Sequence, residues 1–204
     1  MSFDRTETAV VFIDPQVDVL SKNGKNWSAV GASVTENKTV ENMLRIFKAA
    51  KSAKFNVFIS PHYFFPTDRV WKFNGPLEAE EFATCTFARS GQLSLEGFEG
   101  SGAHWLDEFK PYINDGETVV LSPHKVFGPQ TNDLVIQLRK RGVRRVVLGG
   151  MLAICAWNHI CVICSNRASR FMLLAMRLPG RVILFGAMDI RRQWSTMRFS
   201  RTAW

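Results

Sequence analysis

The feature that most limits the possible folds is an uninterrupted apolar run, AVVFI at residues 9–13, which ends at Asp14 and Pro15. A strand that is apolar at every position is typically buried on both faces, as strands of parallel sheets are. Similar runs follow at residues 56–61, 118–121 and 145–150. The sequence therefore predicts a sheet of parallel strands.

Helical patterns lie between these runs. Apolar residues recur at helical spacing over residues 40–50, and an amphipathic helix is predicted over residues 133–141. Residues 62–115 carry scattered aromatic and acidic residues and predict loops with short helices. Alternation of this kind is typical of an α/β fold with a Rossmann-like parallel sheet and helices on both faces. We expect a single domain over residues 1–204, a length that suffices for one core.

The net charge of +8 is concentrated at one end of the chain. Residues 155–204 hold eight Arg and no Lys, and Asp189 is their only acid. The sequence contains no run of about 18 apolar residues, the length that predicts a membrane-spanning helix. The first residues, MSFDR, do not have the pattern of a signal peptide. We therefore expect a cytoplasmic protein whose four cysteines are reduced.

Four polar residues fall at or just after the ends of predicted strands, namely Asp14, His62, Lys125 and Cys155. In parallel sheets these ends meet at one edge, where ligands bind. A cysteine attacks as a thiolate and needs a base, a cation or a helix N-terminus to become one. Asp14 could accept the thiol proton, and the Lys125 ammonium could stabilise the thiolate. Taken alone, each of these residues is at least as common in a core, in a turn or on the surface as in an active site. The prediction therefore depends on their joint placement.

Three motifs in this order resemble the isochorismatase-like hydrolase family: FIDPQ at residues 12–16, Lys125 followed by TNDL at 131–134, and VVLGGMLA at 146–153 before Cys155. The resemblance covers about residues 7–155. The family includes nicotinamidases, N-carbamoylsarcosine amidases and ureidoacrylate-type amidases. The resemblance implies a hydrolase of small carbonyl or amide compounds that forms homo-oligomers.

The resemblance also implies roles for individual residues. Asp14 would be the general base, Lys125 its partner and Cys155 the nucleophile that forms a thioester. The oxyanion hole would be formed by backbone N–H groups of Ala153, Ile154 and Cys155.

Substrate contacts and metal binding are predicted from the same region. The expected substrate-binding residues are Gln16, His62, Tyr63, Trp71 and Phe127. Nicotinamidase-like members bind a metal here through one Asp and two His, whereas this chain offers only His62, so we expect no metal and no cofactor. We interpret His104 and His124 as surface or loop residues, with His124 near the site through its neighbour Lys125.

Residues 156–204 do not continue the resemblance. The family has a helix beginning VESH after the nucleophile, and this chain has AWNHICVIC. A back-translation of residues 156–170, read after dropping two bases, can give VESHMRDLLEQGFE, which is the missing helix. We therefore interpret residues 156–204 as an out-of-frame segment. Its apolar runs at 171–176 and 182–185 could occupy a helix and a strand.

Alternatives remain open for this segment and for the whole chain. His159, Cys161 and Cys164 could hold zinc, and Cys161 is a second candidate nucleophile. The leading hypothesis is a metal-independent, amidase-like cysteine hydrolase that binds a small molecule but neither nucleic acid nor membrane. The second is a catalytically impaired member that serves as a binding or oligomerisation module. The third is a nucleic-acid binder that uses the basic tail.

Overall fold

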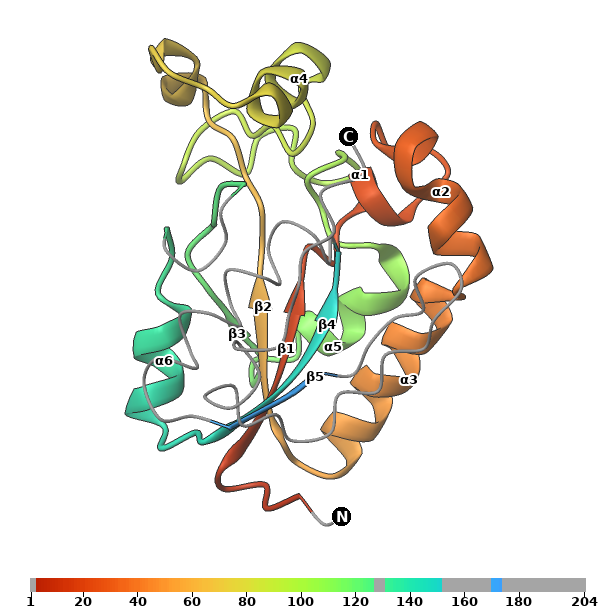
Figure 1. Ribbon diagram of the computed structural model, residues 1–204, viewed down its shortest axis with the longest axis vertical. Coiled ribbons are helices and arrows are strands. Elements are labelled where there is room, and N and C mark those ends of the chain that lie inside the picture. The colour runs from red at the N-terminus through yellow and green to blue at the C-terminus, as the bar shows by residue number, and fades with distance from the viewer. Residues whose placement is uncertain (1–2, 127–130, 152–169, 174–204) are drawn as a thin grey trace, which may run out of the picture.

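The computed structural model describes residues 3–126, 131–151 and 170–173, and its centre is a parallel sheet with the strand order β3-β2-β1-β4-β5 (Figure 1). All four neighbouring pairs of strands are parallel. The strands are β1 (Thr8–Ile13), β2 (Asn56–Ser60), β3 (Val119–Val120), β4 (Arg145–Gly150) and β5 (Arg170–Leu173). Each of the four apolar runs that predicted a strand contains one, so the predicted parallel sheet is confirmed.

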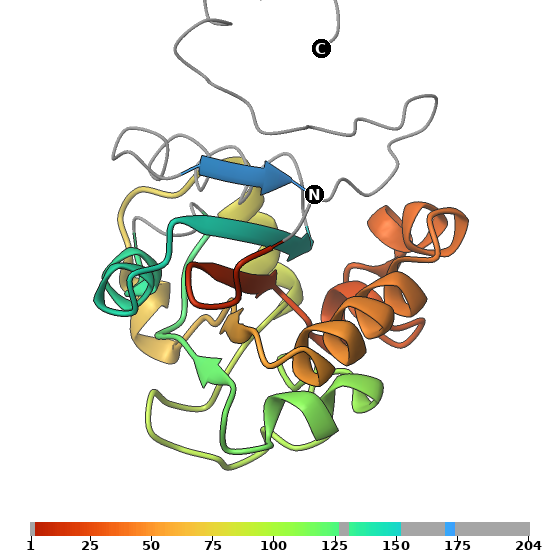
Figure 2. The same ribbon diagram turned by 90° about the horizontal axis from the view of Figure 1, so that it is seen from below.

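Helices cover both faces of this sheet, with α6 on one side and α3 and α5 on the other (Figure 2). The α-helices are α1 (Val17–Leu20), α2 (Trp27–Glu36), α3 (Thr39–Ser52), α4 (Pro76–Thr84), α5 (Lys110–Ile113) and α6 (Leu134–Lys140). Two short 3-10 helices, η1 (Pro66–Val70) and η2 (Asp107–Phe109), complete the long connection between β2 and β3. The predicted helices at 40–50 and 133–141 and the short helices within 62–115 are therefore present.

Strand β1 lies at the centre of the sheet, and all six of its residues are buried. Val10 and Phe12 pack in a cluster that includes residues of α3, and the Phe12 and Phe47 rings stack with centroids 3.6 Å apart. Val11 and Ile13 pack in a second cluster, which includes residues of α6. Because alternate side chains of a strand point to opposite faces, burial on both faces explains why the run is apolar at every position.

The strand β5 differs from the sequence expectation. The sequence allows the run at 171–176 to occupy a helix, whereas Arg170–Leu173 pairs in parallel with β4, Arg170 lying opposite Arg145. A short apolar run suits a buried strand as well as a helix, and pairing with β4 decides between them. The rest of residues 156–204 lies outside the described residues, so the out-of-frame interpretation and the single domain remain predictions. Within the described part of the chain, no helix has the length and apolar character that crossing a membrane requires.

Candidate active site

Asp14 lies immediately after β1, at the edge of the sheet where the strands end. Its backbone has a φ of +50°, in the left-handed region that residues other than glycine seldom adopt. Its N–H donates a hydrogen bond to the carbonyl of Ser60, the last residue of β2, at 3.1 Å. The residue is buried, with 6% of its surface exposed. The end of β1 thus holds a carboxyl group in an unusual backbone conformation, which is a frequent property of functional sites.

The end of β4 lies directly against the end of β1. Gly150 is paired with Ile13 and has a φ of +121°. A Cβ atom at Gly150 would lie 2.0 Å from the Ile13 carbonyl oxygen, so only glycine allows this approach. The N–H of Met151 then donates to the same carbonyl at 3.1 Å. The predicted oxyanion-hole residues Ala153 and Ile154 and the predicted nucleophile Cys155 follow this point and lie outside the described residues.

The side chain of Asp14 contacts His124. The His124 Nε2 atom lies 2.8 Å from Oδ1 of Asp14, and both side chains are buried. Burial raises the pKa of Asp14, against the effect of the neighbouring His124. Burial alone would lower the pKa of His124, but the Asp14 charge and hydrogen bonds with Asp14 and with the backbone carbonyls of Lys125 and Ser60 outweigh it, so this pKa is raised.

A second histidine lies beside this pair. The rings of His62 and His124 stack with centroids 4.9 Å apart. Nε2 of His62 is 3.7 Å from Oε2 of Glu81 in α4, and each of these buried atoms has no hydrogen-bond partner in the described structure. Burial, followed by the charges of His124 and Lys125, holds the pKa of His62 well below its usual value. Burial and neighbouring carboxylates raise the pKa of Glu81 to about 8.

Lys125 points to a different carboxylate from the one predicted. Its ammonium donates to the Tyr63 carbonyl at 2.7 Å and forms a short ion pair with Asp68 in η1. It also lies over aromatic rings, 4.5 Å from the centroid of Phe65 and 5.7 Å from that of Trp71. Neither a hydrogen bond nor an ion pair joins Lys125 to Asp14 among the described contacts. The structure therefore places Lys125 in the wall formed by residues 63–71.

The predicted substrate-binding residues have different surroundings. The amide of Gln16 is buried, donates to the backbone carbonyls of His62 and Ala103, and accepts from the His62 N–H. Tyr63 is buried against Trp105 and Phe98. The side chain of Trp71 is partly exposed. Phe127 lies outside the described residues.

Sequence reasoning did not find Asp68 or Glu81, and it assigned His124 and His104 to the surface or to loops. Both histidines lie in connecting segments, but they are buried. One sequence signal could have found His124, because the tripeptide Ser-Pro-His begins at the last residue of β2, at residues 60–62, and recurs after β3 at 122–124. The two segments run side by side, with a parallel bridge between His62 and His124. Equivalent positions after adjacent strands therefore bring both histidines to Asp14.

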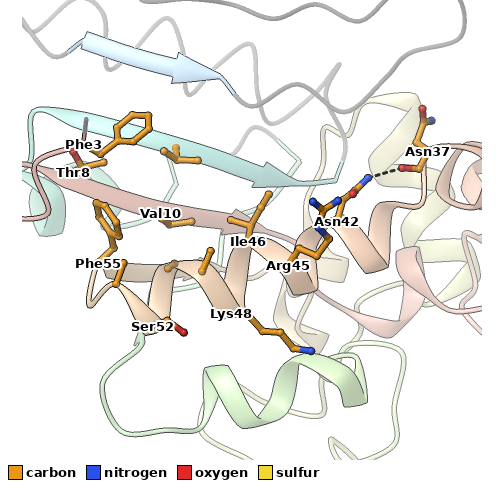
Figure 3. A pocket seen from close by; sticks show the side chains of 14 residues that line it. Phe3, Thr8, Val10, Asn37, Asn42, Arg45, Ile46, Lys48, Ser52 and Phe55 are labelled. Atoms are coloured by element: carbon orange, nitrogen blue, oxygen red, sulfur yellow. Dashed lines mark hydrogen bonds between the residues drawn. The ribbon is translucent and has the colours of Figure 1, made fainter. Parts of the chain in front are cut away.

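A large cavity of about 990 Å³ lies away from this cluster, between α3 and the strands β1 and β4 (Figure 3). Its lining includes Thr8 and Val10 from the first half of β1, together with Ile46 and Phe55. None of the residues that line it is a His, Cys, Asp or Glu. The cavity therefore holds no carboxylate, imidazole or thiol, and the candidate site remains the cluster around Asp14.

Donor atoms of Asp14, His62 and His124 lie within 4.8 Å of one another, a spacing at which a metal ion could be held. The Asp14 and His124 atoms are engaged with each other at 2.8 Å, so a metal on both would have to replace that hydrogen bond. The structure corrects the reason for expecting no metal, because His124 joins His62 beside Asp14 and supplies the second histidine. The absence of a metal itself stays a prediction.

The isochorismatase domain model matches residues 8–167, more than three-quarters of the 204 residues. The chain belongs to the isochorismatase family. This confirms the resemblance read from the three motifs and makes the chain an isochorismatase-like hydrolase. No curated protein matches the sequence.

Solved structures show the same fold. A cysteine hydrolase from Pseudomonas syringae pv. phaseolicola 1448A has a TM-score of 0.64 at 16% identity, covering 92% of this chain and 80% of that one. N-carbamoylsarcosine amidase from Thermoplasma acidophilum has a TM-score of 0.57 at 18% identity, with 87% and 86% covered. A nicotinamidase from Bacillus subtilis has a TM-score of 0.57 at 14% identity, with 82% and 83% covered. The α/β isochorismatase-like fold predicted from the sequence is thereby confirmed.

Proposed function

We propose that this isochorismatase-family hydrolase is an amidase that acts on small molecules through a cysteine thioester and without a metal. Asp14 is the general base and Cys155 the nucleophile in this proposal. The solved structures with this fold include amidases by name, such as an N-carbamoylsarcosine amidase and a nicotinamidase. Small amides and N-carbamoyl compounds are therefore the first substrates to test.

The observation that carries the proposal is the contact between the ends of β1 and β4. The Met151 N–H donates to the carbonyl of Ile13, the residue before Asp14. Cys155 is four residues further along the chain, and four extended residues span at most about 14 Å. The chain therefore limits the backbone distance between Cys155 and Met151, whose N–H contacts the residue before Asp14, to about 14 Å.

The proposed chemistry uses one proton that Asp14 takes and returns. Asp14 accepts the thiol proton of Cys155 as the sulfur bonds to the substrate carbonyl carbon. The carbon–nitrogen bond then breaks, Asp14 gives the proton to the leaving nitrogen, and a thioester remains. Water adds to the thioester carbon and gives a proton to Asp14. The carbon–sulfur bond breaks, the sulfur regains the proton, and a carboxylic acid leaves.

The remaining groups have supporting roles in the proposal. Backbone N–H groups of residues 153–155 would bind the oxyanion of each tetrahedral intermediate. Tyr63, Trp71 and Phe127 would contribute to the substrate pocket, and the buried Gln16 would hold the chain around it. The role of Lys125 as partner of Asp14 stays a prediction. The cytoplasmic location and the homo-oligomer likewise remain predictions.

The test uses substitutions that remove chemistry while preserving size. Cys155→Ser and Asp14→Asn should each abolish the release of ammonia or amine from a panel of small amides, with an unchanged circular dichroism spectrum. Cys161→Ser is the matched control and should retain activity. Full activity in Cys155→Ser together with loss of activity in Cys161→Ser would show that Cys161 is the nucleophile and Cys155 is not. If the unsubstituted chain hydrolyses nothing and Cys155 is unreactive, the impaired binding module is the better description.

A further inference from the structure

The further inference concerns the large cavity beside α3, which takes no part in the proposed chemistry. Its volume of about 990 Å³ is at the upper end of the range for pockets that bind small molecules. The walls are α3 and the strands β1 and β4 (Figure 3). From β1 it uses Thr8 and Val10, in the half of the strand that lies farther from Asp14. The cavity is therefore a separate place in the fold.

Small side chains on α3 create this hollow. Ala49 and Ala50 of the helix and Ala53 directly after it all line the cavity, and their methyl groups fill little of the space beside the sheet. Ile46 and Phe55 supply larger apolar surfaces, and each is only partly buried. Removing such apolar surface from water is favourable. An occupant of the cavity should therefore be apolar along its length.

One end of the cavity carries an uncompensated positive charge. Arg45 lies beside Asn42 at this end, whereas Phe3 and Phe55 lie towards the other end (Figure 3). Arg45 is exposed and has no hydrogen bond or ion pair within the described part of the chain. None of the described residues that line the cavity is an Asp or a Glu. A guanidinium in this setting is suited to a carboxylate, which it can bind through two parallel hydrogen bonds.

The cavity is elongated along the helix, because its lining extends from Asn42 to Ala53. At 1.5 Å per residue this stretch is about 16 Å long. The charge of the cavity disfavours two other occupants. Residues 174–204 of the chain itself contain six Arg and one Asp, so their charge has the same sign as Arg45. A second copy packed through this face by a two-fold axis would bring the same cationic surface against itself.

We propose that this cavity is a binding site for a long-chain carboxylate, whose alkyl chain lies along α3 against Val10 and Ile46 and whose carboxylate contacts Arg45. The alkyl chain matches the apolar, elongated shape of the hollow, and the carboxylate supplies the charge that its lining lacks. Binding involves no covalent step. The site is independent of the proposed amidase reaction, so either can fail without the other.

Isothermal titration calorimetry of the full chain tests the charge, with decanoate and its uncharged analogue decanol as the probes. We expect one decanoate per chain and about fivefold weaker binding of decanol, the effect of losing one exposed ion pair. Arg45→Gln should weaken decanoate binding to the level of decanol and leave decanol unchanged. Arg139→Gln, at an exposed position of α6, is the matched control and should leave both unchanged.

A second variant tests the place of binding. Ala49→Trp puts a large side chain into the cavity from an exposed helix position and should abolish binding of both probes with an unchanged circular dichroism spectrum. Ala83→Trp, at an exposed position of α4, should retain binding. The proposal is overturned if the full chain binds no decanoate, if decanol binds equally well, or if Ala49→Trp keeps its affinity. Binding that appears only after removal of residues 174–204 would also overturn it and would assign the cavity to the chain's own C-terminal segment.

Discussion

His124 and Lys125 are neighbours in the chain, yet each serves a different carboxylate. His124 contacts Asp14 at the end of a core strand, and Lys125 contacts Asp68 in the wall formed by residues 63–71. The first pair is almost completely buried, whereas the side chains of the second are 17% and 11% exposed. Consecutive residues of an extended segment point in opposite directions. Two adjacent residues therefore have different roles: His124 contacts the carboxyl group of the candidate site, and Lys125 pairs with Asp68 in the segment 63–71 beside it.

The largest expected effect separates the two carboxylates by activity. Asp14→Asn removes the proposed base and should lower kcat/KM by about 10²–10⁴-fold, the usual contribution of general acid–base catalysis. Asp68→Asn keeps the shape of the wall and should lower kcat/KM less than about tenfold, since that carboxylate is not expected to exchange the reacting proton. Steady-state hydrolysis of one amide by both variants measures the two losses in kcat/KM. Equal losses would show that the two pairs do not have separate roles.

The second prediction concerns stability at the wall. Lys125→Met leaves the Asp68 carboxylate without its cation, and we expect the free energy of unfolding to fall by about 3 kcal/mol. Lys140→Met, on the exposed face of α6, is the control and should change it by less than about 0.5 kcal/mol. Urea unfolding measures both. Adding Asp68→Asn to Lys125→Met should recover part of the loss, and purely additive losses would mean that the pair contributes nothing.

The third prediction concerns the pH dependence of stability that is caused by Glu81, the carboxyl group beside His62. Burial and nearby carboxylates raise the pKa of this carboxyl to about 8, above its ordinary value of 4.5. The folded state thus binds the proton more tightly than the unfolded state, so stability is greatest below pH 4.5 and is lost as the pH rises towards 8. Glu81→Gln should remove this loss, amounting to about 4 kcal/mol at pH 8.5 relative to pH 5.

Urea unfolding at several pH values tests this prediction, with the exposed Glu80→Gln as the control. A parallel pH dependence in Glu81→Gln and the unsubstituted protein would show that Glu81 is ionised in the folded state at neutral pH.

The sequence predicted the sheet well because burial on both faces leaves a clear pattern. The run at 9–13 is apolar at every position, and the glycines at 149 and 150 mark where β4 meets β1. The short β3 was also predicted, since Val119 and Val120 stand within an apolar run. These elements follow from local composition, and tertiary packing did not alter them.

The pairing of the charged groups was harder to predict. Which of His124 and Lys125 faces the sheet edge depends on the register of a short segment beside residues 60–62, and the sequence alone does not define that register. Asp68 and Glu81 come from the long connection after β2, whose path is set by packing against aromatic residues. The strand at 170–173 was missed because an apolar run of this length fits a helix equally well.

The smallest expected effect is that of a chelator. Dialysis against EDTA should change the hydrolysis rate less than about twofold, because Asp14 and His124 hydrogen-bond to each other and the proposed chemistry uses Cys155 and Asp14 alone. The measurement compares rates before dialysis, after it, and after adding back zinc or iron. Loss on dialysis with recovery on addition of either metal would contradict the metal-independent mechanism and would assign the Asp14, His62 and His124 cluster to metal binding.

The reactivity of Cys155 tests the central claim most directly, because it reports the charge at the site without requiring a substrate. Iodoacetamide labelling across pH, with peptide mass spectrometry to resolve the four cysteines, gives a midpoint for each thiol. We predict that Cys155 reacts with a midpoint well below 8 and that it has the lowest midpoint of the four cysteines. A midpoint near 8.5 for Cys155 in the unsubstituted protein, or a low midpoint at Cys161 instead, would contradict the account.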